Sequence, residues 1–188
     1  EIQLLIVATI SSDTETPSTA CQVQALLGAA HAVAFDINAA CSGFLYAVHI
    51  AEAFIKSGMY ENALLIGAET LSKLVDWTDR GTCVLFGDGA GAAVLTASES
   101  QGILSQSIGS NGSKWEVLSC AGRPNQNPLC QGDGTPGYLR MDGQEVFKFA
   151  VKTVPICIED ALKKAGLSPE EVTYFLLHPA NRQIIQSV

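Results

Sequence analysis

The sequence is poor in charge, and the charge it has is unevenly placed. Charged residues make up only 16% of the 188, hydrophobic residues 47%, and the formal net charge is −8. No lysine or arginine precedes Lys56, so a basic surface for nucleic acid or an anionic membrane is not expected. The apolar fraction excludes a disordered chain and predicts a compact α/β protein with a substantial core.

Long apolar runs and cysteine motifs are lacking as well. No run reaches the length of a membrane-spanning helix, and the first residues show no signal-peptide pattern. The six cysteines form no CxxC pair and have no metal-ligand spacing with the three histidines. We therefore expect no metal and no other cofactor. Scattered single cysteines favour a reducing, cytoplasmic location.

Strand and helix patterns alternate along the chain. Apolar runs predict strands at residues 2–8, 33–37, 62–68, 84–86, 92–96, 102–109 and 172–177. Helices are predicted at residues 19–27, 42–56 and 142–164, with another beginning near residue 181. The glycine-rich residues 87–91 lack the Gly-Lys-Ser/Thr of a phosphate loop and are interpreted as a tight connection between strands. Residues 111–137 are predicted to form a long loop.

Cys41 stands where a strand pattern gives way to a helical one. A cysteine at the start of a helix lies at the positive end of the helix dipole, which would lower its pKa from about 8.5 toward neutrality. The free backbone N–H groups there could also hold an oxyanion that forms on a thioester carbonyl. On this position alone, a buried structural cysteine is an equal alternative.

His178 is the histidine best placed to assist such a nucleophile. It follows the predicted strand at residues 172–177, and ligands in α/β folds gather at the carboxyl ends of strands. Cys41 also follows a strand, so the two side chains could meet at one edge of a sheet. His31 and His49 lie in a short loop and within a helix, where structural roles are more common.

Five segments resemble the motifs of one family. Residues 36–44 read DINAACSGF and resemble the nucleophile motif of β-ketoacyl-acyl-carrier-protein synthase III, the initiating condensing enzyme of bacterial fatty-acid synthesis. Residues 78–82 (TDRGT), 86–91 (FGDGAG), 141–148 and 178–181 (HPAN) resemble further motifs of that family, in the same order. The resemblance covers the whole chain.

This resemblance implies a thiolase-like fold with α/β/α/β/α layers, built from two similar halves. Residues 1–110 would belong to the N-terminal half, residues 111–137 to a loop-rich connection, and residues 138–188 to the beginning of the C-terminal half. The chain opens within an apolar run and stops within a helical pattern, so we expect a central fragment of a longer protein. Such a fragment would lack the family's asparagine donor and C-terminal glycine loop, and would be catalytically incomplete alone.

The resemblance also implies an acyltransferase. Cys41 would take the acyl group of a short acyl-coenzyme A, and malonyl-acyl-carrier protein would lose carbon dioxide and attack the acyl-cysteine to give a 3-oxoacyl product. His178 would hydrogen-bond the malonyl thioester oxygen. The implied coenzyme A contacts are Arg80, Gly81, Met141, Gly143, Phe147, Ala180 and Asn181, and the implied acyl-pocket positions are Leu71, Phe86 and Thr16. The implied protein is a cytoplasmic homodimer that binds neither nucleic acid nor membrane.

Two positions depart from the family pattern. Gln183 stands where an arginine is usual, which puts one contact to coenzyme A or carrier protein in doubt. Thr16 stands where many members carry a large aromatic, which predicts a roomier pocket for longer or branched primers.

Three alternatives stay open. A polyketide or hydroxymethylglutaryl-type synthase would use the same cysteine and histidine. A cysteine hydrolase would release its acyl group to water without a malonyl substrate. A partner subunit, or an incomplete fragment, would keep the fold without catalysis.

Overall fold

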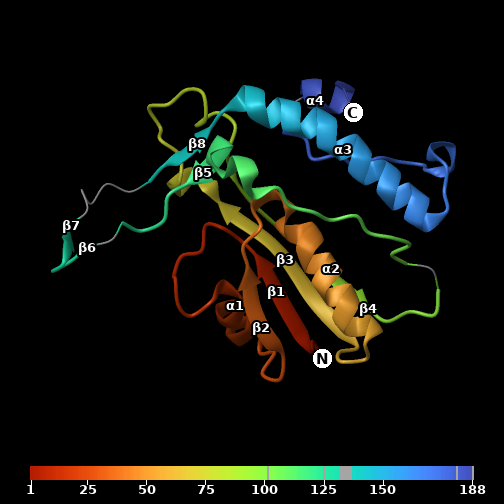
Figure 1. Ribbon diagram of the computed structural model, residues 1–188. Coiled ribbons are helices and arrows are strands. Elements are labelled where there is room, and N and C mark those ends of the chain that lie inside the picture. Colours follow the sequence, from red (N-terminus) through yellow and green to blue (C-terminus); the bar gives the residue numbers. More distant parts are fainter. Residues whose placement is uncertain (101, 125, 132–136, 181, 188) are drawn as a thin grey trace. The chain divides into compact units, whose positions relative to one another are not determined.

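The computed structural model describes residues 1–100, 102–124, 126–131, 137–180 and 182–187 (Figure 1). The chain divides into two compact units. Unit 1 consists of Glu1–Lys73 and Phe86–Gln101, and unit 2 of Leu74–Leu85 and Gly102–Val188. These units are defined by their compactness. The division into two related halves, at residues 1–110 and 138–188, is a different one and stays a prediction.

A four-stranded sheet forms the centre of unit 1, in the order β2-β1-β3-β4. The central strand β1 (Leu4–Ala8) runs parallel to β2 (Val33–Ile37) and to β3 (Asn62–Thr70). The edge strand β4 (Asp88–Thr96) runs antiparallel to β3 over nine residue pairs. The carboxyl ends of β1, β2 and β3 therefore lie at one edge of the sheet.

The two faces of β1 pack against different helices, which gives unit 1 three layers. Leu4 and Ile6 pack with Ala47 and Ala51 of α2 (Gly43–Lys56). Leu5 and Val7 pack with Ala20 of α1 (Thr19–Leu27) on the opposite face. A central strand that is buried on both faces is expected to be apolar throughout, as these residues are.

Local signals in the sequence set the ends of α1. The Ser18 hydroxyl accepts the Cys21 amide at the start of the helix. Gly28 follows the helix with φ of 65°, and its amide donates to the carbonyls of Ala25 and Gln24. This helix was predicted with the same bounds because both capping residues can be recognised in the sequence.

Unit 2 contains one long helix and short elements. The helix α3 (Gly143–Ala165) begins after Asp142, whose carboxylate accepts the Gln144 and Glu145 amides, and ends at Gly166 in the left-handed conformation. The short elements are η3 (Gly112–Val117), β5 (Leu118–Cys120), β6 (Gln126–Asn127), β7 (Cys130–Gln131), β8 (Leu139–Met141), η4 (Pro169–Glu171) and α4 (Arg182–Ser187). β5 pairs with β8, and β6 pairs with β7, in both cases antiparallel.

Three predicted strands are wrong. Residues 84 and 85 belong to a turn in which the Leu85 amide donates to the Thr82 carbonyl at 2.9 Å. Residues 102–109 pair with no strand in the described part of the chain, and the Ser105 hydroxyl donates instead to the Ala161 carbonyl of α3 at 2.6 Å. Residues 172–177 pair with no other described residues. An apolar run becomes a strand only where a neighbour completes its hydrogen bonds.

Two further predictions need correction. The glycine-rich segment is not a connection between strands, because β4 begins at Asp88 and pairs with β3 through these glycines. The long loop at residues 111–137 contains η3 and short strands. Within the described residues, no helix combines the length and the apolar character needed to cross a membrane.

Candidate active site

Cys41 lies in η1 (Ala40–Ser42), a 3-10 turn between β2 and α2. Ala40 has φ of 45°, in the left-handed region that a residue with a Cβ rarely adopts. The Ser42 amide donates to the Ala39 carbonyl at 3.1 Å and closes the turn. The strained residue turns the chain sharply between strand and helix, and it places Cys41 at the edge formed by the carboxyl ends of the parallel strands.

The start of α2 packs so closely on the sheet that only a glycine fits. A Cβ atom on Gly43 would lie 2.9 Å from the Cβ of Ala8, the last residue of β1. Phe44 lies over Gly67 of β3, where an added Cβ would be 3.5 Å from its ring. The first contact excludes a side chain at Gly43, whereas the second is an ordinary van der Waals distance.

The thiol of Cys41 ionises less readily than that of an ordinary cysteine. Burial around the sulfur raises its pKa, although the residue as a whole is exposed; a hydrogen bond from its own backbone lowers the pKa, and the negative charge of Glu69 raises it. The prediction of a pKa lowered toward neutrality is therefore wrong. The resting sulfur is a thiol at neutral pH, so a nucleophilic reaction needs a proton acceptor.

Two carboxylates that support this region were not assigned a role from the sequence. Asp36 of β2 accepts the amides of Thr19 and Ala20 at 2.8 and 2.7 Å and holds the start of α1. Glu69 of β3 accepts the Ile10 amide at 3.0 Å. The signal that could have pointed to them is a single acidic residue within, or at the end of, an otherwise apolar strand.

The three predicted acyl-pocket residues all belong to unit 1. Leu71 begins η2 (Leu71–Lys73) directly after β3, and Phe86 lies two residues before β4; both are half-buried. Thr70 pairs with Asp88, so Leu71 and Phe86 lie at the same end of the β3–β4 pair. This end is the carboxyl end of β3, at the edge of the sheet where Cys41 also lies. Thr16 is exposed in the loop between β1 and α1.

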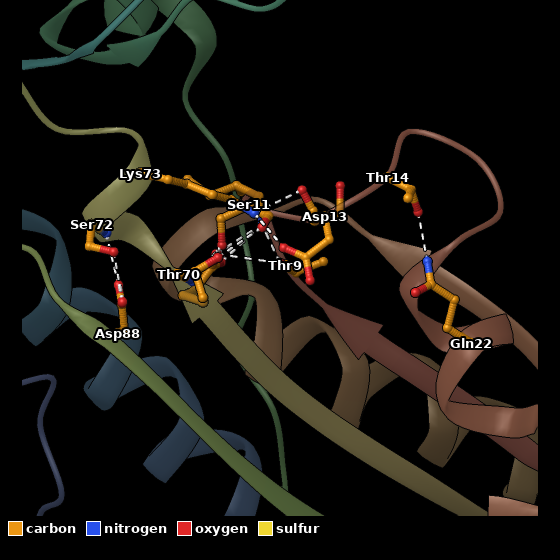
Figure 2. Close-up of polar contacts among 12 residues, drawn as sticks. Thr9, Ser11, Asp13, Thr14, Gln22, Thr70, Ser72, Lys73 and Asp88 are labelled. Carbon is orange, nitrogen blue, oxygen red and sulfur yellow. Dashed lines mark hydrogen bonds and ion pairs between the residues drawn. The ribbon is translucent and has the colours of Figure 1, made fainter. Parts of the chain in front are cut away.

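A hydrogen-bonded link joins η2 to β4 at this end (Figure 2). The Ser72 amide and hydroxyl donate to the two carboxylate oxygens of Asp88 at 2.8 and 2.7 Å. These bonds lower the pKa of Asp88. The conformation that carries Leu71 is therefore set by local polar contacts as well as by the sheet.

The predicted coenzyme A residues Arg80 and Gly81 lie on a tightly bonded turn of unit 2. Asp76 accepts the amide and the hydroxyl of Thr78 at 2.8 and 2.6 Å, and these bonds lower its pKa. Asp79 accepts the Gly81 amide at 2.9 Å and the Thr82 hydroxyl at 2.7 Å. Arg80 is exposed on a turn whose backbone the two carboxylates fix.

Met141, Gly143 and Phe147 lie around the start of α3. Met141 ends β8, Gly143 is the first helical residue, and Phe147 follows one turn later, half-buried. Glu145, in the same turn, forms ion pairs with Lys148 at 2.8 Å and with Lys114. These contacts lower the pKa of Glu145 to about 2.

His178 and Ala180 are exposed in a segment of unit 2 without regular secondary structure that precedes α4. Asn181 lies outside the described residues. Because Cys41 belongs to unit 1 and His178 to unit 2, the meeting of the two side chains stays a prediction. The described residues contain no group of three or more His, Cys, Asp or Glu side chains placed to hold a metal ion.

The chain is similar to known proteins along its whole length. The family model described as 3-oxoacyl-[acyl-carrier-protein (ACP)] synthase III matches residues 35–112. A β-ketoacyl-[acyl-carrier-protein] synthase III of Clostridium novyi is 50% identical over 189 residues, which cover 100% of this chain. The chain spans 58% of the length of that relative.

Solved structures agree with the fold. The crystal structure of 3-oxoacyl-[acyl-carrier-protein] synthase III from Aquifex aeolicus is 48% identical, with a TM-score of 0.88 over 99% of this chain and 56% of that chain. A priming β-ketosynthase from the R1128 polyketide pathway is 32% identical, with a TM-score of 0.87 over 100% of this chain and 56% of that chain. These matches confirm the predicted α/β fold of the thiolase type.

Proposed function

Because the chain belongs to the 3-oxoacyl-[acyl-carrier-protein] synthase III family, we propose that the protein carrying it is the acyltransferase that initiates fatty-acid synthesis. The observation that supports this proposal most directly is the position of Cys41. It is an exposed cysteine on a strained strand-to-helix turn, at the edge where the parallel strands β1, β2 and β3 end and within the segment that the family model matches.

In the first step, the sulfur of Cys41 attacks the carbonyl carbon of a short acyl-coenzyme A. The carbon–sulfur bond to coenzyme A breaks, coenzyme A leaves as a thiol after taking a proton, and the acyl group is held on Cys41. Backbone N–H groups at the start of α2 stabilise the oxyanion of the tetrahedral intermediate. Since the resting thiol is protonated, the step requires a base, and His178 has the appropriate chemistry.

In the second step, malonyl-acyl-carrier protein loses carbon dioxide. The electron pair left on the α-carbon attacks the acyl carbonyl, and the bond to the Cys41 sulfur breaks, which releases 3-oxoacyl-carrier protein and leaves a thiolate that takes a proton from water to restore the resting thiol. His178 donates a hydrogen bond to the malonyl thioester oxygen while that oxygen carries the enolate charge. No cofactor takes part in this sequence of steps.

The proposed substrate contacts are those predicted from the resemblance. Arg80 and Gly81 bind the adenine end of coenzyme A, and a fixed turn that presents an exposed arginine suits a phosphate-bearing nucleotide. Met141, Gly143, Phe147, Ala180 and Asn181 line the pantetheine channel, and Leu71, Phe86 and Thr16 the acyl pocket. We propose a cytoplasmic homodimer; the six unpaired cysteines favour that compartment.

The test is intact mass spectrometry of the whole protein that carries these residues, after incubation with acetyl- and longer acyl-coenzyme A. Cys130 is also an exposed free cysteine, so Cys130→Ala is the matched control. We expect one acyl adduct, lost in Cys41→Ala and retained in Cys130→Ala. A folded whole protein that forms no adduct, or an adduct that persists in Cys41→Ala, would overturn the proposal.

A priming ketosynthase of polyketide synthesis is the second candidate, favoured by the structural match to such an enzyme. Both candidates acylate Cys41, so the adduct does not separate them. Turnover with carrier proteins from the two kinds of pathway separates the two candidates, because each enzyme must extend its own malonyl-carrier protein. Release of the acyl group to water without any malonyl substrate would indicate a cysteine hydrolase instead.

A further inference from the structure

Leu71 lies between residues that are tied to the loop after β1 (Figure 2). Before it, the Thr70 amide donates to the Ser11 hydroxyl at 2.7 Å, and the Thr70 hydroxyl donates to the Ser11 carbonyl at 3.1 Å. After it, the Lys73 ammonium donates to the Asp13 carboxylate at 2.9 Å. The chain is therefore held to another part of unit 1 on both sides of Leu71.

Ser72, the residue directly after Leu71, is bound to Asp88, the first residue of β4. Its amide donates to one carboxylate oxygen at 2.8 Å, and its hydroxyl donates to the other at 2.7 Å. The amide belongs to the planar peptide group that joins Leu71 to Ser72, so the bond orients the backbone at Leu71 itself. Both bonds lower the pKa of the Asp88 carboxyl, and the ionised carboxylate can accept the two donors at once.

Asp88 also lies close to Phe86, the second predicted pocket residue of this region. Asp88 pairs with Thr70 in the antiparallel register of β3 and β4. Phe86 precedes Asp88 by two residues, and Leu71 follows Thr70 by one. One carboxylate therefore connects the two segments that carry the half-buried side chains of Leu71 and Phe86.

The side chain of Asp88 contributes to η2 rather than to the sheet. Backbone pairing over nine residues already joins β4 to β3. The carboxylate binds Ser72, which lies two residues beyond the pairing partner Thr70. Its loss would therefore release the turn that carries Leu71 while the two strands stay paired.

The turn belongs to the unit that carries the nucleophile. Phe44, three residues after Cys41, lies over Gly67 of β3, where an added Cβ would be 3.5 Å from its ring. Gly67 precedes Leu71 by four residues. Cys41, Leu71 and Asp88 all belong to unit 1, so a movement of η2 would take place within the compact unit that positions Cys41.

We propose that Asp88 is a positioning residue for acyl-group selectivity, which holds η2 so that Leu71 limits the length of the acyl group that Cys41 accepts. This inference rests on the proposed function, which assigns Leu71 and Phe86 to the acyl pocket. An apolar wall discriminates acyl lengths only while it stays in place, because a misplaced methylene group in a tight pocket changes the rate by about tenfold or more. Without the carboxylate, the Leu71 side chain can give way to a longer chain.

The test measures the rate at which acyl-coenzymes A of increasing length acylate Cys41 in the whole protein, by intact mass spectrometry. In Asp88→Ala, we expect the rate with longer acyl groups, relative to acetyl, to rise roughly three- to tenfold. Asp88→Asn can still accept the Ser72 amide and can donate to its hydroxyl, so it should restore most of the wild-type ratio. Asp79→Ala is the matched control: it removes a similar pair of bonds in unit 2 and should change all acyl lengths by the same factor.

A double-mutant cycle asks whether Asp88 acts through Leu71. Leu71→Ala enlarges the pocket directly and should shift the ratio in the same direction as Asp88→Ala. In the Leu71→Ala background, the further change Asp88→Ala should then alter the ratio by less than about twofold. Effects that multiply independently would overturn the inference, as would an unchanged ratio in folded Asp88→Ala.

Should Asp88→Ala fail to fold, Ser72→Ala removes the hydroxyl bond and keeps the amide bond. It should shift the ratio in the same direction by a smaller factor, and an unchanged ratio in that folded variant would count against positioning. Failure of the proposed function looks different, because wild-type Cys41 would then form no acyl adduct with any acyl-coenzyme A. Hydrogen exchange of the Ser72 amide needs no acyl substrate and should become faster in Asp88→Ala. An unchanged exchange rate would show that the carboxylate does not hold the turn.

Discussion

The two units position their functional residues by different means. In unit 1, β1 is buried along its whole length and Leu65 of β3 is fully buried. In unit 2, α3 has no buried residue, and Phe149 and Leu176 are 53% and 95% exposed. Cys41 therefore rests on a packed sheet, whereas the proposed substrate contacts of unit 2 rest on caps, turns and ion pairs. Close packing fixes a nucleophile more rigidly than exposed polar contacts fix a binding surface.

The largest expected difference concerns the core. Leu65→Ala leaves a cavity between the sheet and α2, and should lower the free energy of unfolding by about 2–5 kcal/mol. Leu176→Ala removes an exposed side chain and should change it by less than about 0.5 kcal/mol. Urea unfolding of the 188-residue chain measures both. A comparable loss in Leu176→Ala would remove the contrast between the units.

The carboxylates at the starts of the helices give the next test. Asp36→Ala removes two hydrogen bonds to the first turn of α1 and should cost about 1–2 kcal/mol. Asp142→Ala removes the cap of the exposed helix α3 and should cost about 1 kcal/mol. Hydrogen exchange of the amides of each helix assigns the loss to its unit. An equal loss of protection at both helices would argue against the stronger role of Asp36.

The strained turn at Ala40 should respond in the opposite direction. Ala40→Gly removes a Cβ from a left-handed residue and should leave unfolding unchanged or raise its free energy by up to about 1 kcal/mol. Ala53→Gly, on the exposed side of α2, should lower it by about 1 kcal/mol. Thermal unfolding of the two variants compares them. Destabilisation by Ala40→Gly would show that the turn carries no relievable strain.

The smallest expected effect is the acid response of unit 2. The pKa of Glu145 is lowered from 4.5 to about 2 by Lys114 and Lys148, so its contribution to stability is complete above about pH 4.5 and is lost as the pH falls toward 2. The melting temperature of wild type should thus fall more over this range than that of Glu145→Gln. Because the ion pairs of Glu145 lie at the surface, the difference should be small and should shrink in high salt.

Local signals made part of the fold predictable. The bounds of α1 and β2 were predicted correctly because Ser18, Gly28 and the apolar run at residues 33–37 act over short distances. The start of β4 was not predicted, because its glycines have little strand propensity. This strand forms because its residues pair with β3. The apolar residues 172–177 have the composition of a strand, but no described residues pair with them.

Only part of the candidate site could be predicted from the sequence as well. The turn at Cys41 was predictable because strand, cysteine and helix are contiguous. The raised pKa of Cys41 was not, because its main cause is burial of the sulfur in the folded chain, to which the charge of Glu69 adds. The bond between Ile10 and Glu69 likewise joins residues 59 positions apart. Partners brought together by a sheet leave no local pattern in the sequence.

The pairing of β1 also has a consequence for how the chain folds during synthesis. Leu4 pairs with Val33 and with Ala63, so its two neighbours follow 29 and 59 residues later (33 − 4 and 63 − 4). The strand Leu-Leu-Ile-Val-Ala therefore leaves the ribosome well before either neighbour exists. Parallel pairing at this separation forms slowly, and an uncharged apolar strand left waiting is prone to aggregate. Chaperone dependence in the cell would originate at this strand, which later becomes the most deeply buried part of unit 1.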